Sequence, residues 1–157
     1  MILDEQDLVR WGARIGARIQ PPVCVVLTGP VGAGKSVLAR AIVRGAGIVE
    51  VVPSPTFNLL FRYSAPHGIQ FVHLDLYRLE HPDDLWEIGW EELGGPDEVL
   101  LIEWPERAGE LLPEDRWEVS LEVADGDVLR RSVEVTRVGD PGFLPGFPVR
   151  LSSGGDE

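Results

Sequence analysis

The stretch GPVGAGKS, residues 29–36, decides the fold class of this 157-residue chain. It matches the pattern G-x-x-x-x-G-K-[ST] in full. Its glycines let backbone N–H groups curl around phosphate oxygens at the start of a helix, where a Cβ atom would clash. In such loops the lysine, here Lys35, bridges the β- and γ-phosphates, and the hydroxyl of Ser36 coordinates Mg²⁺. We therefore predict a loop that binds a nucleoside triphosphate rather than a glycine-rich turn without a ligand.

Lys35 is the only lysine in the chain, whereas the other thirteen of the 14 basic side chains are arginines. A compact ammonium fits into a cage of phosphate oxygens where a planar guanidinium fork does not. The solitary lysine therefore stands at the one position where arginine is no substitute, which favours the phosphate-binding interpretation.

The segments on both sides of the loop predict the strand and the helix that the motif requires. VCVVLT at 23–28 is an unbroken apolar run, typical of a strand covered on both faces. KSVLARAIVRGAG at 35–47 carries an apolar stripe at helical spacing and ends in glycines. Before residue 20, Asp4 is a candidate N-cap of another helix, whose apolar face consists of Leu8, Trp11, Ile15 and Ile19.

The remaining segments complete a single α/β domain. Further strands are predicted at 58–63, 69–79, 99–104, 116–123 and 130–138, the last two forming a hairpin around Asp125-Gly126. Helices are predicted at 81–93, beginning at Pro82, and at 105–114. We assign residues 1–138 to this domain. The stretch 139–157 is dense in Gly and Pro without periodicity and predicts a loosely ordered C-terminal tail.

Composition narrows the function classes. The net charge is −12, with 26 acidic against 14 basic residues, so the chain repels phosphate backbones and is a poor candidate for direct binding of nucleic acid. Solubility or a basic protein partner explains the negative charge. The single cysteine, Cys24, excludes a disulfide framework. With no signal peptide and no apolar stretch near the roughly 20 residues of a membrane span, we expect a cytoplasmic protein without a membrane partner.

Two strands end in an acid, as metal binding and hydrolysis at such a loop require. VLLIE ends at Glu103 after a uniformly apolar run, which favours Glu103 as the metal ligand, and FVHLD ends at Asp75, which could reach water at the γ-phosphate. Thr56, in SPTF at 54–57, is a candidate switch-loop hydroxyl, although a turn or a helix cap is the usual role of a Thr beside Pro. His73 alternates with Asp75 on one strand face and is more often a packed than a catalytic histidine.

Five motifs occur here in the order and spacing of the TsaE (YjeE) family: GPVGAGKS, SPTF, HLDLYRL, the Glu87-Ile88-Gly89 stretch and IEWPE. The sequence resembles that family over nearly the whole domain. The resemblance implies an α/β, P-loop NTPase-like three-layer fold with a mixed central sheet. It also implies a bacterial ATPase that works with TsaB and TsaD to make threonylcarbamoyladenosine in tRNA. The negative net charge agrees with a factor that acts on the protein that holds the tRNA, so we expect only indirect contact with tRNA.

The same resemblance implies the roles of individual residues. Ser36 and Glu103 hold Mg²⁺, and Asp75, Lys35 and Thr56 serve hydrolysis. ATP is bound by Gly32, Ala33, Gly34, Lys35, Ser36 and Val37, and by Arg131, the better match than its neighbour Arg130. A residue at the start of the first helix, near Glu5 or Gln6, contacts the base. The family usually has Thr at the position of Ser36, and either hydroxyl can ligate a metal ion.

Two other classes of function are open at this point. The first is a small-molecule or nucleoside kinase, since many short chains with such a loop transfer phosphate. Kinases of this kind usually close an arginine-rich lid over the phosphates, but residues 82–98 are acidic and contain no arginine. The second is a binding module that a nucleotide gates, for which hydrolysis is incidental.

Overall fold

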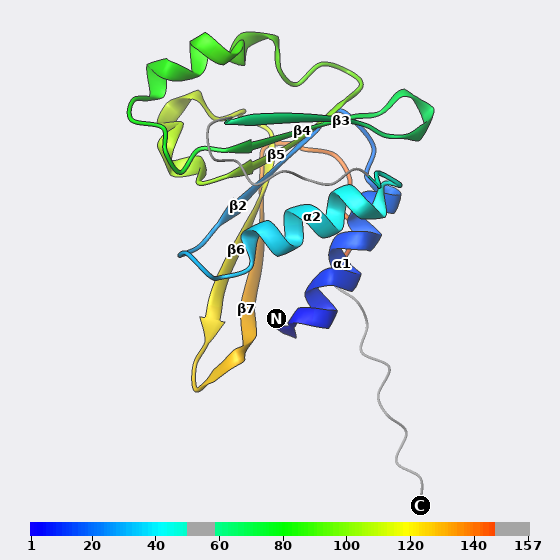
Figure 1. The fold of residues 1–157 in the computed structure, drawn as a ribbon, viewed down its shortest axis with the longest axis vertical. Coiled ribbons are helices and arrows are strands. Elements are labelled where there is room, and N and C mark those ends of the chain that lie inside the picture. Colours follow the sequence, from blue (N-terminus) through cyan, green and yellow to red (C-terminus); the bar gives the residue numbers. More distant parts are fainter. Residues whose placement is uncertain (50–58, 147–157) are drawn as a thin grey trace, which may run out of the picture.

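The computed structural model describes residues 1–49 and 59–146 and shows a β-sheet with covering segments on both faces (Figure 1). The strands are β1 Ile2–Asp4, β2 Val23–Thr28, β3 Leu60–Ser64, β4 Gln70–Asp75, β5 Glu98–Glu103, β6 Arg116–Ala124 and β7 Asp127–Val138. The α-helices are α1 Glu5–Arg18 and α2 Lys35–Gly45. Five short 3-10 helices complete the order: η1 Pro66–Gly68, η2 Pro82–Ile88, η3 Trp90–Glu92, η4 Pro105–Arg107 and η5 Gly109–Leu111.

The sheet is mixed, as predicted, with the order β1-β7-β6-β2-β5-β4-β3. β2 pairs in parallel with β5 and β6, and β4 pairs in parallel with β5. Antiparallel pairs lie at both sides, β3 with β4, β6 with β7 and β1 with β7. Because β2, β5 and β4 are parallel, their carboxyl ends meet at one edge, where open α/β sheets bind ligands. The register places Leu27, Glu103 and Asp75 side by side in one row there.

The two α-helices lie side by side on one face of the sheet (Figure 1). Asp4 is the N-cap of α1, and its side chain accepts a hydrogen bond of 2.8 Å from the backbone N–H of Asp7. The predicted apolar face of α1 is buried, Trp11 and Ile15 included. α1 and α2 approach so closely that a Cβ atom on Gly16 would lie 1.9 Å from the carbonyl oxygen of Ile42. Glycine at this crossing therefore holds α2, and the loop before it, tightly against the domain.

The other face of the sheet buries a second, smaller apolar cluster that includes Cys24, Val26, Leu74 and Ile102. The segment after β4 and the segment after β5 cover it with 3-10 helices. This differs from the prediction of α-helices at 81–93 and 105–114. Gly89 adopts φ 78° between η2 and η3 and interrupts the helical run. Neither half then reaches the length at which an α-helix becomes favourable.

One strand was not predicted. β1 is three residues long and pairs with the far end of the chain, Ile2 opposite Ser132 and Leu3 opposite Arg131. Its pairing closes the β7 edge, and Leu3 is fully buried in the larger core. A strand this short has no periodicity of its own and depends on its partner.

Residues 139–146, the described part of the expected C-terminal tail, run back along the domain. The indole Nε1 of Trp11 donates a buried hydrogen bond of 3.1 Å to the carbonyl oxygen of Pro145, and Leu144 packs against the core. The remainder, residues 147–157, lies outside the described residues, so the domain boundary at 138 stays a prediction. Within the described part of the chain, none of the helices has the length and apolar character needed to cross a membrane.

Candidate functional site

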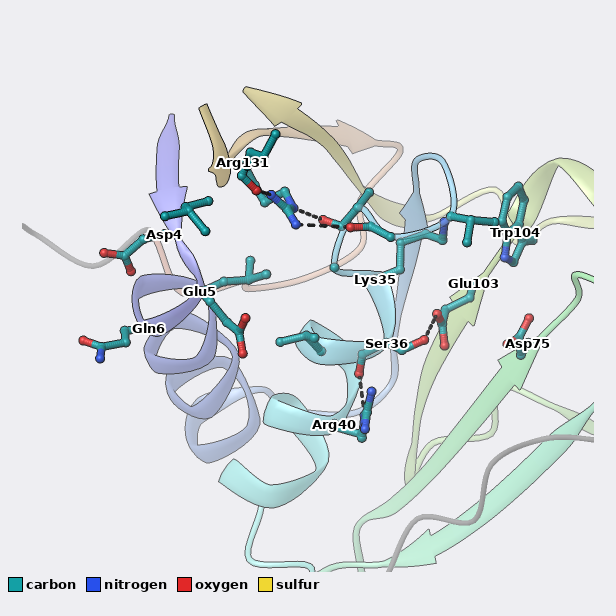
Figure 2. A pocket seen from close by; sticks show the side chains of 18 of the residues that line it. Asp4, Glu5, Gln6, Lys35, Ser36, Arg40, Asp75, Glu103, Trp104 and Arg131 are labelled. Atoms are coloured by element: carbon teal, nitrogen blue, oxygen red, sulfur yellow. Dashed lines mark hydrogen bonds between the residues drawn. The ribbon is translucent and has the colours of Figure 1, made fainter. Parts of the chain in front are cut away.

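A cavity of about 850 Å³ opens at the carboxyl ends of β2, β4 and β5. Figure 2 shows the start of α1 on one side of the glycine loop and the acids of β4 and β5 on the other. Most of the predicted site residues line this cavity: Gly32, Ala33, Gly34, Lys35, Ser36, Val37, Asp75, Glu103 and Arg131. Glu5 and Gln6, expected near the base, line it too. Thr56 lies outside the described residues.

All three glycines of the loop, Gly29, Gly32 and Gly34, have positive φ angles that L side chains rarely adopt. Gly29 has φ 139°, and a Cβ atom there would lie 2.1 Å from the carbonyl oxygen of Leu121 on β6. Gly34 has φ 104° and is the N-cap of α2. The loop can therefore turn directly from β2 into α2, and the free N–H groups at the start of α2 face the cavity as an anion-binding end.

Lys35 lies in the first turn of α2 and is only 5 % exposed. Its Nζ donates to the carbonyl oxygens of Gly29 and, at 3.0 Å, of Pro30, and lies 4.0 Å from the centre of the Trp104 ring. Burial lowers the pKa of Lys35 below its usual value, while the nearby carboxylates, Glu103 foremost, act in the opposite direction. The loop thus holds a desolvated ammonium at the floor of the cavity.

Glu103 and Ser36 join the end of β5 to the start of α2. The Ser36 hydroxyl donates to Glu103 Oε1 over 2.9 Å, and the second oxygen, Oε2, lies 2.6 Å from Nε2 of His73 (Figure 2 shows the first contact). Burial alone would raise the pKa of Glu103, which is 2 % exposed. The hydrogen bonds from His73 and Ser36 and the positive charge of Lys35 outweigh burial and hold that pKa below its usual value. Glu103 is therefore an ionised carboxylate at neutral pH.

Asp75 ends β4 directly opposite Glu103 in the sheet register. Its Oδ1 accepts a hydrogen bond of 3.1 Å from the backbone N–H of Tyr77. Partial burial, with the charge of Glu103 as a smaller contribution, raises the pKa of Asp75 above its usual value. The two neighbouring acids thus have pKa values displaced in opposite directions, a pattern typical of acids with different tasks at one site.

The donor set at this edge fits Mg²⁺. The hydroxyl of Ser36 and the carboxylate of Glu103 are hard oxygen ligands, and they already contact one another. Within residues 1–49 and 59–146, no three His, Cys, Asp or Glu side chains form a metal-binding group. Mg²⁺ is commonly held by only one or two protein ligands, with water and substrate phosphates completing its octahedron. The residues therefore suit an ion that a nucleotide brings with it.

Arg131 reaches the loop from β7. Its Nε donates to the carbonyl oxygen of Ala33 at 3.0 Å and its Nη2 to that of Gly32 at 3.2 Å (Figure 2). Its neighbour Arg130 instead pairs with Asp127 at 3.4 Å beside a separate, smaller cavity. Arg131, and not Arg130, thus lies at the loop, where its guanidinium binds backbone carbonyl groups.

Two aromatic residues of the site received no role from sequence. Trp104 follows Glu103 with φ 58°, a left-handed conformation that is rare for a large side chain. It packs against Tyr77 with ring centres 5.0 Å apart and lies under the Lys35 ammonium. The signal was a tryptophan directly after a strand-end acid, but only the fold shows that the chain turns there to place the ring in the cavity.

One family model and several known proteins are similar to the chain over most of its length. The family model described as "Threonylcarbamoyl adenosine biosynthesis protein TsaE" matches residues 2–133. A protein of Treponema pallidum, named tRNA threonylcarbamoyladenosine biosynthesis protein TsaE, is 40 % identical over 124 residues, 78 % of this chain and 90 % of that protein. A protein of the same name from Haemophilus influenzae is 35 % identical, over 72 % of this chain and 74 % of its own length. Among solved structures, the crystal structure of YdiB from Bacillus subtilis is similar with a TM-score of 0.69 and 26 % identity, covering 88 % of this chain and 84 % of YdiB.

Proposed function

The chain belongs to the TsaE family, and on that premise we propose that it serves threonylcarbamoyladenosine biosynthesis in tRNA as a Mg²⁺-dependent ATPase. The observation that carries the proposal is the convergence of four residues on one cavity: Lys35, Ser36, Asp75 and Glu103. Each supplies a different group that phosphoryl transfer to water requires, namely a cation for the phosphates, two oxygen ligands for a metal ion and a second acid near the attacking water.

Binding of ATP follows from the glycine loop and its support. The N–H groups at the start of α2 donate hydrogen bonds to the phosphates, and the Lys35 ammonium exchanges its two carbonyl partners for phosphate oxygens. Arg131 holds the carbonyl groups of Gly32 and Ala33 and so keeps the opposite side of the loop fixed. A residue at the start of α1, Glu5 or Gln6, both of which line the cavity, contacts the base.

Hydrolysis is assigned to the acid edge, the carboxyl ends of β4 and β5 with Asp75 and Glu103. Ser36 and Glu103 would hold Mg²⁺, which would supply positive charge at the phosphate oxygens. Asp75 lies beside Glu103 with a raised pKa, which brings it closer to the range in which a carboxylate can accept a proton from water. Thr56 contributes a switch-loop hydroxyl.

The partners are TsaB- and TsaD-type proteins. A factor with a net charge of −12 is unsuited to holding tRNA itself, because the phosphate backbone has the same sign of charge. It acts on the protein complex that holds the tRNA, in the cytoplasm, and the partner complex stimulates a turnover that is slow in its absence.

The test measures ATP hydrolysis and nucleotide affinity with and without a TsaB–TsaD complex. We expect partner-dependent release of phosphate into water. Lys35→Ala and Lys35→Arg should both abolish nucleotide binding, because neither side chain restores a compact buried ammonium. Asp75→Asn should leave ATP affinity within about threefold but lower turnover by roughly 100-fold or more, the usual contribution of a general base.

Three outcomes contradict the proposal. The first is the absence of nucleotide binding by the unaltered chain, and the second is wild-type turnover by Asp75→Asn. The third is transfer of the labelled γ-phosphate to a metabolite rather than to water, which would favour a kinase. Survival of tRNA modification in a variant that binds ATP without hydrolysing it would instead favour a nucleotide-gated binding module.

A further inference from the structure

His73 is a buried side chain to which the proposed function gives no task. It lies on β4 two residues before Asp75, on the same face of the strand, and is 6 % exposed. Its Nε2 lies 2.6 Å from Oε2 of Glu103. A polar ring buried this deeply needs a hydrogen-bond partner, and the partner it has is the carboxylate that the proposed function places on Mg²⁺.

Because of this contact, each oxygen of the Glu103 carboxylate has its own hydrogen-bond partner. An ionised carboxylate only accepts hydrogen bonds, so Nε2 of His73 carries the proton and donates to Oε2. The other oxygen, Oε1, faces Ser36 at 2.9 Å. One hydrogen bond of the carboxylate therefore goes to His73 on β4 and the other to Ser36 on α2. Two hydrogen bonds to different elements fix the plane of the carboxylate.

We propose that His73 is a positioning residue, which fixes the rotation of the Glu103 carboxylate so that Oε1 stays beside the Ser36 hydroxyl. The inference rests on the proposed function, because it concerns the same pair of oxygen ligands. A ligand that is hydrogen-bonded from behind keeps its orientation when the metal ion arrives. Removing such an outer partner typically weakens metal binding by roughly 10–100-fold.

The competing explanation is that the ring only fills space. In the sheet register, His73 lies between Phe61 on β3 and Leu101 on β5. A space-filling role predicts that substitutions lower the stability of the fold without changing metal affinity. A positioning role predicts that metal affinity follows the presence of a donor at the place of Nε2 and not the stability.

The experiment measures Mn²⁺ binding to the ADP-bound full chain by electron paramagnetic resonance, and ADP affinity in EDTA by calorimetry. His73→Leu keeps the bulk and removes the donor, whereas His73→Gln carries an amide N–H that can reach the place of Nε2. His73→Asn carries a shorter amide that does not reach it. Val72→Ala, on the opposite face of β4 and fully buried, is the matched control for loss of stability.

We expect His73→Leu and His73→Asn to weaken Mn²⁺ binding by roughly 10–100-fold, while ADP affinity in EDTA stays within about twofold. His73→Gln should recover most of the Mn²⁺ affinity, and Val72→Ala should keep all of it. If His73→Leu does not fold, the Gln and Asn variants make the same comparison with two polar side chains.

The inference is overturned if the variants bind Mn²⁺ as the unaltered chain does, or if Gln restores no more affinity than Asn. Failure of the proposed function gives a different result, because the unaltered chain would then bind no ADP, or no Mn²⁺ in its presence.

Discussion

The two faces of the sheet are built in different ways. On one face, α1 and α2 pack against each other through glycines and bury the larger core, with Trp11, Leu38 and Ile42 inside it. On the other, 3-10 helices and loops cover the smaller core around Leu85 and Ile102. The first face carries the glycine loop on the end of a helix, whereas the acids opposite are carried by the strands themselves. The phosphate-binding end of the site therefore depends on helix packing, and the acid edge depends on strand register.

The contrast is tested first at the helix crossing, where the largest effect is expected. A Cβ atom on Gly16 would lie 1.9 Å from Ile42 O and 2.8 Å from Ala46 N, and both of these atoms are backbone. Gly16→Ala should therefore lower the free energy of unfolding by about 3 kcal/mol or more, since the two helices must move apart. Urea unfolding followed by circular dichroism measures it.

Gly95→Ala is the control, because a Cβ atom there meets only the end of the Glu98 side chain at 3.7 Å. It should change stability by less than about 0.5 kcal/mol. Equal effects of the two substitutions would show that the glycines of the crossing are not close-packed.

The second comparison is between two buried leucines, one on each face. Leu38 of α2 and Leu85 of η2 are both fully buried. Truncation of a buried Leu to Ala typically lowers stability by about 2–5 kcal/mol, depending on how far the surroundings can collapse. We expect Leu38→Ala at the upper end of that range and Leu85→Ala at the lower end, because short 3-10 turns can move into the space. The same urea unfolding measurement tests this. A larger loss of stability in Leu85→Ala than in Leu38→Ala would contradict the predicted difference between the two faces.

A smaller effect is expected at the start of α1. Asp4→Ala removes the cap of the Asp7 N–H and should lower the free energy of unfolding by about 1 kcal/mol. Asp83→Ala, in the first turn of η2, serves as the matched substitution on the other face and should change stability by less than about 0.5 kcal/mol. Thermal unfolding of the pair distinguishes them, and equal losses would contradict the role of Asp4 as a cap.

The smallest effect is expected at Cys24, which lies in the second core and is 4 % exposed. Burial raises the pKa of its thiol to about 12, so at pH 8 the native protein holds almost no reactive thiolate. Iodoacetamide should therefore label the native chain only as fast as the second face opens. Mass spectrometry follows the rate, which should rise more in Leu85→Ala than in Leu38→Ala. Rapid labelling of the unaltered native chain would contradict this.

Sequence alone predicted what local patterns determine. β2, the glycine loop and α2 are adjacent in sequence, so one motif with its flanks described all three within a residue or two. The cap at Asp4 and the buried face of α1 were equally local. Glu103 and Asp75 were found because acids that end apolar strands are visible one strand at a time.

What sequence missed depends on distant partners. β1 exists only because it pairs with β7, and the covering of the second face follows from the left-handed Gly89 rather than from helical periodicity. The contact from His73 to Glu103 crosses from β4 to β5, and the position of Trp104 follows from a strained backbone turn. Periodicity contains no information about either of these.

The buried position of the only lysine has a practical consequence for protein chemistry. Reagents that acylate side-chain amines have a single target in this chain, Lys35, which is 5 % exposed and lines the cavity. The fraction of chains with one acyl group on a side chain is therefore the fraction in which Lys35 has reacted. A ligand in the cavity would shield the amine, so the acylated fraction of Lys35 would fall as the cavity fills.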